Sequence, residues 1–145
     1  MFAENYKEAA DIYCDLQNDA LIGNQGVIIR QYVPLKSFSE SLSGMPFSNE
    51  WRFFFYKESL LAVGYYWTNS DVIPDLKDLP QNAYKKAQEI AKILSDKVNF
   101  FVIDLAETTT GEWILIEAND GQQSGLNGIN PDILYSNLSK ILKKQ

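Results

Sequence analysis

The sequence predicts an α+β fold in which helices pack on one face of an antiparallel sheet of about five strands. Three observations support this class. Segments with apolar side chains at helical spacing occur near the beginning, the middle and the end of the chain. Short strand-like segments occur in pairs that a tight turn separates, and such hairpins are antiparallel. The chain has 145 residues, of which 46% are hydrophobic, so we expect a single domain with its own core over residues 1–145.

Three helices are expected, each from a stripe of apolar side chains along one side. The first covers residues 4–18 and the second covers residues 81–97. The third begins after Asn130, a residue type that caps helix N-termini, with Pro131 at the first helical position. The apolar stripes consist of Ala9, Ile12, Tyr13 and Leu16; of Ala83, Ala87, Ile90, Ala91 and Leu94; and of Leu134, Leu138, Ile141 and Leu142.

Strands are expected where β-branched and aromatic side chains lie between clusters of turn residues. The first such strand is stopped by Pro34, because proline cannot donate a ladder hydrogen bond. Two pairs of strands then form hairpins, one before and one after the second helix. The expected strands cover residues 27–33, 51–56, 60–67, 99–105 and 112–119, and the polar segments 36–49 and 68–80 are expected to be loops.

Composition excludes several classes of function. The formal net charge of −6 argues against a nucleic-acid binder, which needs clustered Lys and Arg. No apolar stretch approaches the ~20 residues that a membrane helix needs, so no membrane partner is expected. The single cysteine allows no intrachain disulfide and favours a reducing, cytoplasmic location. The absence of histidine excludes Ser-His-Asp and Cys-His catalysis and the usual zinc enzyme sites.

Three hard oxygen ligands stand on two neighbouring strands. Glu117 and Asn119 point the same way out of an apolar strand, because side chains alternate faces. Asp104 ends the preceding apolar strand. Magnesium uses such carboxylate and amide oxygens when it bridges nucleotide phosphates. The alternative is that these residues only start turns, as Asp and Asn commonly do at strand ends. If the carboxylates do crowd together, removing one should raise stability in the absence of metal.

The two arginines of the chain, Arg30 and Arg52, both fall inside expected strands. A charged residue in an apolar run must face water or hold an anion or a carboxylate. One interpretation is an exposed sheet face or a structural pair such as Glu50 with Arg52. The other is a clamp for phosphate or for a substrate carboxylate. The aromatic residues of the hairpin 51–67 are expected to form core and cross-strand pairs, with a stacking site for a ligand as the alternative.

In this order the pieces resemble the C-terminal portion of an ATP-grasp domain, the fold of a superfamily of ATP-dependent carboxylate–amine ligases. Residues 100–126 are particularly similar to a clade of ATP-grasp proteins from bacteria and phages, and the resemblance covers about residues 27–138. The pieces that carry it are the strand and hinge Val27–Pro34, the motif Glu50-Trp51-Arg52, the strand-ending Asp104, and the motif Glu117-Ala118-Asn119.

The resemblance implies ATP and Mg²⁺ as cofactors and amide- or peptide-bond formation through an acyl phosphate. It assigns Asp104, Glu117 and Asn119 to Mg²⁺. It assigns the hinge Gln31, Tyr32 and Val33 to the adenine, through the backbone of its first and last residues. Arg52 would stabilise the transferring phosphoryl group or hold the substrate carboxylate, with Arg30 as the second catalytic candidate. Phosphoryl transfer needs positioning and charge neutralisation more than covalent help, so a site without histidine can perform it.

The resemblance also implies a partner. In the family, a preceding lobe supplies phosphate-binding lysines and a flexible glycine-rich loop, and the residues before Val27 are too few to form it. We therefore expect an N-terminal lobe of the same protein as a partner, a nucleotide and a small-molecule or peptide as ligands, and no ATP turnover by this chain alone. Two alternatives stay open: a non-catalytic binding module that uses the aromatic hairpin, and a kinase-like phosphotransferase.

Overall fold

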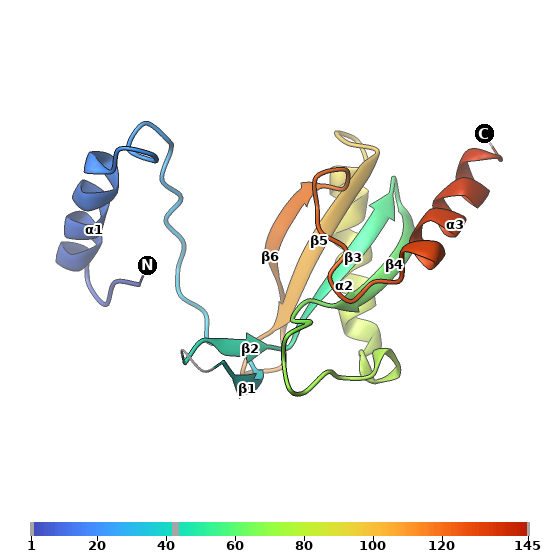
Figure 1. The fold of residues 1–145 in the computed structure, drawn as a ribbon, viewed down its shortest axis with the longest axis horizontal. Helices are drawn as coiled ribbons and strands as arrows, with labels where there is room; N and C mark the ends of the chain where they lie inside the picture. The colour runs from blue at the N-terminus through green and yellow to red at the C-terminus, as the bar shows by residue number, and fades with distance from the viewer. Residues whose placement is uncertain (1, 42–43, 145) are drawn as a thin grey trace. The chain divides into compact units, whose positions relative to one another are not determined.

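The computed structural model describes residues 2–41 and 44–144 and divides the chain into two compact units, one up to Val33 and one from Pro34 onward (Figure 1). The first unit contains one helix, α1 (Tyr6–Asn18). The helices and strands of the second unit are β1 (Ser37–Glu40), β2 (Pro46–Ser48), β3 (Glu50–Tyr56), β4 (Ser59–Tyr65), the 3₁₀ helix η1 (Leu76–Asp78), α2 (Gln81–Leu94), β5 (Phe100–Glu107), β6 (Trp113–Asp120) and α3 (Pro131–Leu142). Within the described residues, no helix is both long and apolar enough to span a bilayer.

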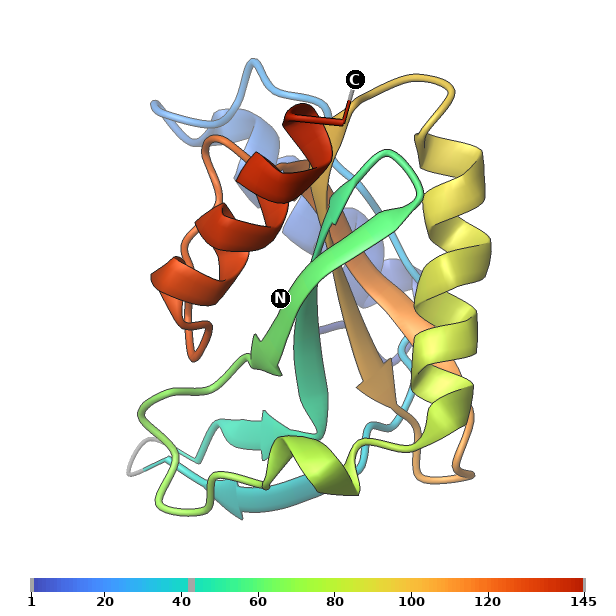
Figure 2. The same ribbon diagram turned by 90° about the vertical axis from the view of Figure 1, so that its right-hand side faces the viewer.

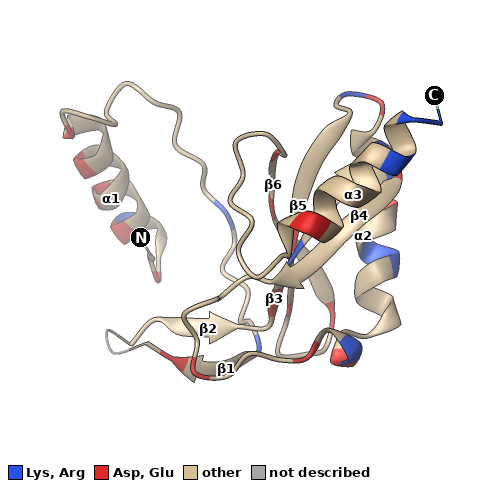
Figure 3. Cartoon of the chain, turned by 45° about the vertical axis from the view of Figure 1, so that its right-hand side comes forward, with Lys and Arg blue, Asp and Glu red and all other residues tan. Residues whose placement is uncertain are grey.

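Helix α1 begins as its capping residue requires. The Asn5 side chain accepts hydrogen bonds from the backbone N–H groups of Lys7 and Glu8, which have no partner inside the first turn. The Glu8 carboxylate accepts in return from the backbone N–H of Glu4, which completes a reciprocal cap. The helix expected at residues 4–18 is therefore confirmed, and Figure 3 shows that its charged positions are mainly acidic.

The strand expected at residues 27–33 is wrong. This segment is extended but forms no strand, and Ile28 and Ile29 are 85% and 74% exposed. β-Branched residues indicate a side-chain preference for a pleated, half-buried surface, and they do not supply a strand to pair with. The loop expected at residues 36–49 is also wrong in part, because β1 and β2 pair there as a small antiparallel sheet.

The main sheet is antiparallel throughout, in the order β4-β3-β5-β6 (Figure 1). β3 and β4 form the expected hairpin, with Lys57 in the left-handed conformation at its turn. β5 and β6 form the second hairpin, and β5 pairs with β3 in the centre of the sheet. The α+β class and the antiparallel sheet are confirmed, with four strands in the main sheet and two in the small one.

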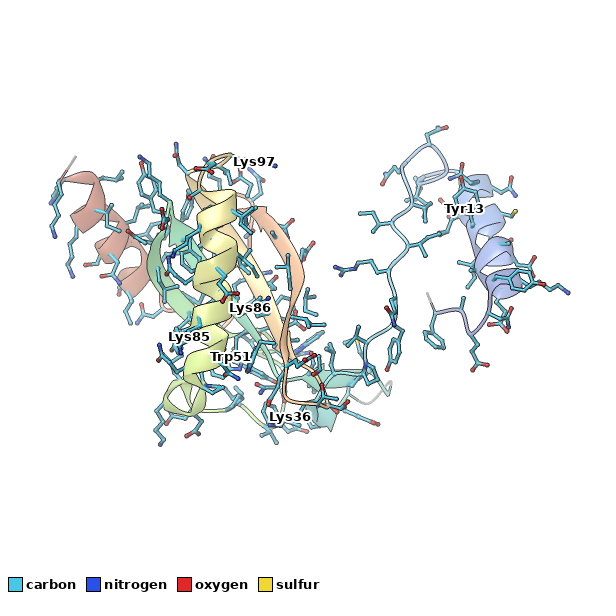
Figure 4. The ribbon with its side chains drawn as sticks, turned by 180° about the vertical axis from the view of Figure 1, so that it is seen from behind. Tyr13, Lys36, Trp51, Lys85, Lys86 and Lys97 are labelled. Atoms are coloured by element: carbon cyan, nitrogen blue, oxygen red, sulfur yellow. The ribbon has the colours of Figure 1, made fainter. Side chains whose placement is uncertain are left out.

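The two helices of this unit lie on opposite faces of the main sheet, α2 on one and α3 on the other (Figure 2). Successive residues of β3 show why. Phe53 and Phe55 belong to the core under α2, whereas Phe54 belongs to the core under α3. Because the central strands are apolar on both faces, one layer of helices would leave half of the sheet uncovered. Trp51 belongs to the α2 core, while Lys85 and Lys86 lie on the outer side of α2 (Figure 4).

The start of α3 matches the sequence in detail. The Asn130 side chain accepts a hydrogen bond from the backbone N–H of Asp132, and Pro131 occupies the first turn. The completely buried Leu134 anchors the helix on the sheet. The segment between β6 and α3 is thereby held against the end of β4, and it carries part of the candidate site.

Candidate functional site

Arg52 and Asp104 form a buried ion pair at the centre of the main sheet. They are direct partners in the register of β3 and β5. The Arg52 Nε atom donates to Asp104 Oδ1 at 2.8 Å, and Nη2 donates to Oδ2 at 2.7 Å, which is the bidentate geometry of a strong pair. The two residues are 5% and 1% exposed. The expected pairing of Glu50 with Arg52 is therefore replaced by a pairing with Asp104.

The other edge of the guanidinium is held by the segment after β6. The Arg52 Nη1 atom donates to the Gly125 carbonyl at 2.7 Å and to Asn127 Oδ1 at 3.3 Å. The guanidinium carbon lies 4.9 Å from the centre of the Tyr66 ring, within the range of a cation–π contact. The hydrogen bonds to Asp104 raise the pKa of Arg52 above its usual value, although burial acts in the opposite direction.

Glu117 and Asn119 lie on the same sheet face as this ion pair. Glu117 is the direct partner of Asp104 in the register of β5 and β6, and Asn119 follows two residues later opposite Val102. A register irregularity after Asp104 separates this part of the hairpin from the rest of β5. Both side chains are exposed, in contrast to Asp104. Figure 3 shows acidic positions along β6.

The type of donor fits Mg²⁺, although the described residues hold no ready-made cluster. Among them, no group of three His, Cys, Asp or Glu residues lies close enough to hold a metal ion. Mg²⁺ is commonly held by one or two carboxylates, with phosphates and water filling the remaining positions. Glu117 and Asn119 offer exposed oxygens of this kind, and Asp104 already shares both of its oxygens with Arg52. The assignment of the three residues to a metal stays a prediction.

An open depression of about 390 Å³ lies beside the ion pair. It is lined by Arg52, Asn119, Asp120, Gln123, Ser124 and Gly125. The turn after β6 shapes its wall, because the Asp120 carboxylate accepts from the backbone N–H of Gln122 at 2.6 Å and the Ser124 hydroxyl donates to the Asp120 carbonyl at 2.7 Å. Arg52 gives this depression a positive charge on an otherwise acidic protein.

Glu50 is a buried carboxyl group on the same face, and its importance could not be read from the sequence. It is 5% exposed and accepts one hydrogen bond, from the Ser48 hydroxyl at 3.0 Å. Burial raises the pKa of Glu50 to about 7, and the charges of Asp104 and Glu117 act in the same direction. The hydrogen bond from Ser48 and the charge of Arg52 oppose this shift. Glu50 therefore titrates near neutral pH beside the ion pair.

Sequence reasoning also missed Gly125 and Asn127 as ligands of Arg52. The Asn127-Gly128 dipeptide is a common turn signal, but it indicates only a turn and not a contact with a residue 75 positions earlier. Tyr66 was expected in the aromatic core, whereas its ring lies over the guanidinium.

The expected adenine-binding hinge belongs to the other compact unit. Arg30, Gln31, Tyr32 and Val33 lie in its extended segment, where the Tyr32 ring meets the Phe2 ring edge-on at 5.1 Å between centres. The next residue, Pro34, begins the second unit, and its carbonyl accepts from the backbone N–H of Thr109 at 3.0 Å. The proposed contacts of this hinge with a nucleotide stay a prediction.

A second cavity, of about 270 Å³, lies near the small sheet and is lined by residues that include Lys36, Asn49, Trp51 and Glu107. Its polar groups satisfy one another. The Glu107 carboxylate accepts from Lys36 Nζ at 2.9 Å and from Asn49 Nδ2 at 2.7 Å, and Asn49 Oδ1 accepts from the Trp51 indole at 2.7 Å. This cavity therefore offers a ligand no polar group in need of a partner.

Comparison with known protein families matches residues 2–138 to an ATP-grasp domain family, the third family of its clade. Comparisons with curated proteins and with solved structures gave no match. The matched range includes all of the candidate site residues and most of both compact units. The antiparallel sheet with its buried ion pair and the family match agree with each other, and the chain belongs to this family of ATP-grasp domains.

Proposed function

We propose that this chain forms the ATP- and Mg²⁺-binding lobe of an ATP-dependent carboxylate–amine ligase. The observation that carries the proposal is the placement of Arg52 and Asp104 as a buried pair on the sheet face that also presents Glu117 and Asn119. One fixed cation beside exposed carboxylate and amide oxygens suits a ligand that combines phosphates with a divalent metal ion. The family to which the chain belongs supports the same function.

In this proposal each residue has a separate task. Glu117 and Asn119 hold Mg²⁺ from the exposed side, and Asp104 contributes from the buried side while it keeps Arg52 in place. The Arg52 guanidinium faces the depression and stabilises negative charge there, either on the transferring phosphoryl group or on the carboxylate of the substrate. ATP with Mg²⁺ supplies the phosphoryl group that activates a carboxylate as an acyl phosphate, on which an amine forms the amide bond.

The donor and acceptor substrates belong to the same depression. Its wall contains the Gln123 amide, the Ser124 hydroxyl and the Gly125 backbone, which are neutral hydrogen-bonding groups suited to a small molecule or a peptide end. The hinge Gln31–Val33 is assigned to the adenine, and phosphate-binding lysines are assigned to an N-terminal lobe of the same protein. Without that lobe we expect binding but no turnover.

Titration calorimetry with ATP, in the presence and absence of MgCl₂, tests the proposal. The informative variant is Glu117→Gln, because Glu117 is exposed and its replacement leaves the buried ion pair intact. The matched control is Glu112→Gln, which removes the same charge from an exposed position at the other end of the same hairpin. We expect Mg²⁺-dependent binding by the wild type and by the control, and at least tenfold weaker binding by Glu117→Gln.

Two results would count against the proposal. Equal affinity of Glu117→Gln and wild type would remove Glu117 from the metal site. Absence of any binding of ATP with Mg²⁺ by the wild type would remove the nucleotide site from this chain.

A kinase-like phosphotransferase remains the second candidate function, because it would use the same metal and arginine. Product analysis separates the two once the chain is combined with a first lobe, since only a ligase consumes an amine. A binding surface on the aromatic hairpin has less support. Its rings lie mostly in the two cores, as shown by the almost complete burial of Trp51, Phe53, Phe54, Phe55 and Tyr65.

A further inference from the structure

We propose that Asn127 is a positioning residue that fixes the orientation of the Arg52 guanidinium. Its amide side chain connects Arg52 to the end of β4, so the strength with which the site binds an anion depends on a residue outside the depression. The second statement rests on the proposed function, whereas the first can be tested on the ligand-free protein.

Asn127 uses both ends of its side chain for this connection. Oδ1 accepts from Arg52 Nη1 at 3.3 Å, and Nδ2 donates to the Tyr66 carbonyl at 2.9 Å. The backbone of Asn127 has a φ of 51°, in the left-handed region that asparagine tolerates better than most residues. This conformation directs the side chain back toward the sheet, where it meets the arginine and the strand end together.

The segment that carries Asn127 is packed tightly against β4. A Cβ atom on Gly128 would lie 3.1 Å from the Tyr65 carbonyl oxygen, and one on Gly64 would lie 3.1 Å from the Gly128 carbonyl carbon. Two glycines therefore permit a close approach of two backbones. Ile129, one residue later, is buried in the core under α3. Asn127 is consequently mounted on a rigid support on its C-terminal side.

The hydrogen bonds of Arg52 show what the support achieves. A guanidinium has five N–H donors. Nε and one hydrogen of Nη2 are used by Asp104, and the two hydrogens of Nη1 point to Gly125 and Asn127. One hydrogen of Nη2 is left for a ligand in the depression. Because the other four are held on both edges, the guanidinium cannot turn about its long axis, and this last donor keeps one direction.

Asn127→Gly is the variant that separates the side chain from the backbone. Glycine adopts the left-handed conformation without strain, so the substitution removes both side-chain hydrogen bonds and leaves the turn possible. The matched control is Asn137→Ala on α3. There another asparagine donates from Nδ2 to a β4 carbonyl, that of Leu61, at 2.8 Å, and its loss removes a similar bond away from Arg52.

Nuclear magnetic resonance of the arginine Nε–H groups gives the first measurement, on protein without ligand. The chain has two arginines, so two signals are expected, and Arg52→Lys assigns them. In the wild type and in Asn137→Ala, the Arg52 signal should be sharp and protected from exchange with water. In Asn127→Gly it should shift and exchange at least several times faster. Asn127→Asp keeps the acceptor for Arg52 and should restore the sharp signal.

Titration with ATP and MgCl₂ gives the second measurement. One lost hydrogen bond to a charged group corresponds to about a tenfold weaker affinity, which we expect for Asn127→Gly and not for Asn137→Ala. Equal thermal midpoints of these two variants would show that the difference is not one of stability. If Asn127→Gly does not fold, the Nε–H signal of Asn127→Asp decides, because loss of the Arg52 signal there contradicts the positioning role.

An unchanged Arg52 signal in Asn127→Gly would overturn the proposal, and so would a tighter affinity, which would mean that Asn127 competes with the ligand. If the wild type binds no ATP, the proposed function fails by itself. The Nε–H signals then still decide whether Asn127 positions Arg52.

Discussion

Asp104 and Glu117 face each other directly across β5 and β6, and Arg52 binds Asp104 through both of its carboxylate oxygens. The two carboxylates of the expected metal site therefore have different properties. Asp104 is buried in an ion pair, whereas Glu117 is exposed. Relief of repulsion was the effect expected on removal of either one, and the ion pair reverses that expectation for Asp104.

Asp104→Asn should lower the free energy of unfolding by about 3–5 kcal/mol, because it leaves the buried Arg52 charge without its counter-ion. Urea unfolding monitored by tryptophan fluorescence measures the change. Asp75→Asn is the control, since it breaks the solvent-exposed ion pair with Lys77 and should leave the urea midpoint unchanged. A wild-type midpoint for Asp104→Asn would mean that the ion pair contributes no net stability.

Glu117→Gln should behave differently in the absence of ligand. Its effect on the free energy of unfolding should stay within about 0.5 kcal/mol, as for most exposed positions. Ligand binding to the folded state alone raises stability, by about 2.7 kcal/mol at a concentration of 100 times Kd. A thermal shift on addition of ATP with MgCl₂ is therefore expected for the wild type and not for Glu117→Gln. Equal shifts in both proteins would argue against a metal ligand at this position.

The sequence predicted those parts of the fold that depend on local pattern. The hairpin around Lys57, helix α2 and the cap at Asn130 each follow from residues close together in the chain, and each is confirmed. The segment 27–33 has the side chains of a strand, but pairing requires a partner that no local pattern supplies. The small sheet was missed for the converse reason, since the polar residues of Ser37–Glu40 pair with a segment across a turn.

The candidate site divides in the same way. The common face of Glu117 and Asn119 follows from the two-residue period of a strand, and the structure agrees. The pairing of Arg52 with Asp104 depends on the register of β3 against β5, two strands separated by a hairpin, a loop and a helix. Register over such a distance is set by tertiary packing. The raised pKa of Glu50 depends on burial and could not be anticipated either.

Glu50 should make stability depend on pH. Its pKa is raised from 4.5 to about 7 in the folded protein, so between these values the folded state holds a proton that the unfolded chain has lost. The free energy of unfolding should therefore fall as pH rises through this window. The full effect is roughly 3 kcal/mol, from about 1.4 kcal/mol for each pH unit of the shift.

Comparison of wild type with Glu50→Gln isolates this effect, because glutamine has a similar shape and no charge. Urea unfolding at pH 4 and at pH 8 should show the wild type losing stability relative to the variant as pH rises. A constant difference between the two proteins would mean that Glu50 titrates at its ordinary pKa.

Gly64→Ala tests the close packing of the segment that supports Asn127. The new Cβ would lie 2.6 Å from Ile129 Cγ1 and 3.1 Å from the Gly128 carbonyl carbon, so side chain and backbone must both move. Overpacking of this kind should lower the free energy of unfolding by about 1–3 kcal/mol. Gly26→Ala, where a Cβ meets nothing within 4 Å and φ is not positive, is the control and should have little effect.

The same substitution connects packing to the site. Movement of Gly128 away from β4 should lengthen the hydrogen bond from Asn127 to the Tyr66 carbonyl and release the Arg52 guanidinium. Gly64→Ala should therefore also accelerate exchange of the Arg52 Nε–H, although residue 64 takes no part in the hydrogen bonds that hold the guanidinium. Loss of stability with an unchanged Nε–H exchange rate would show that Arg52 is held by Asp104 and Gly125 alone.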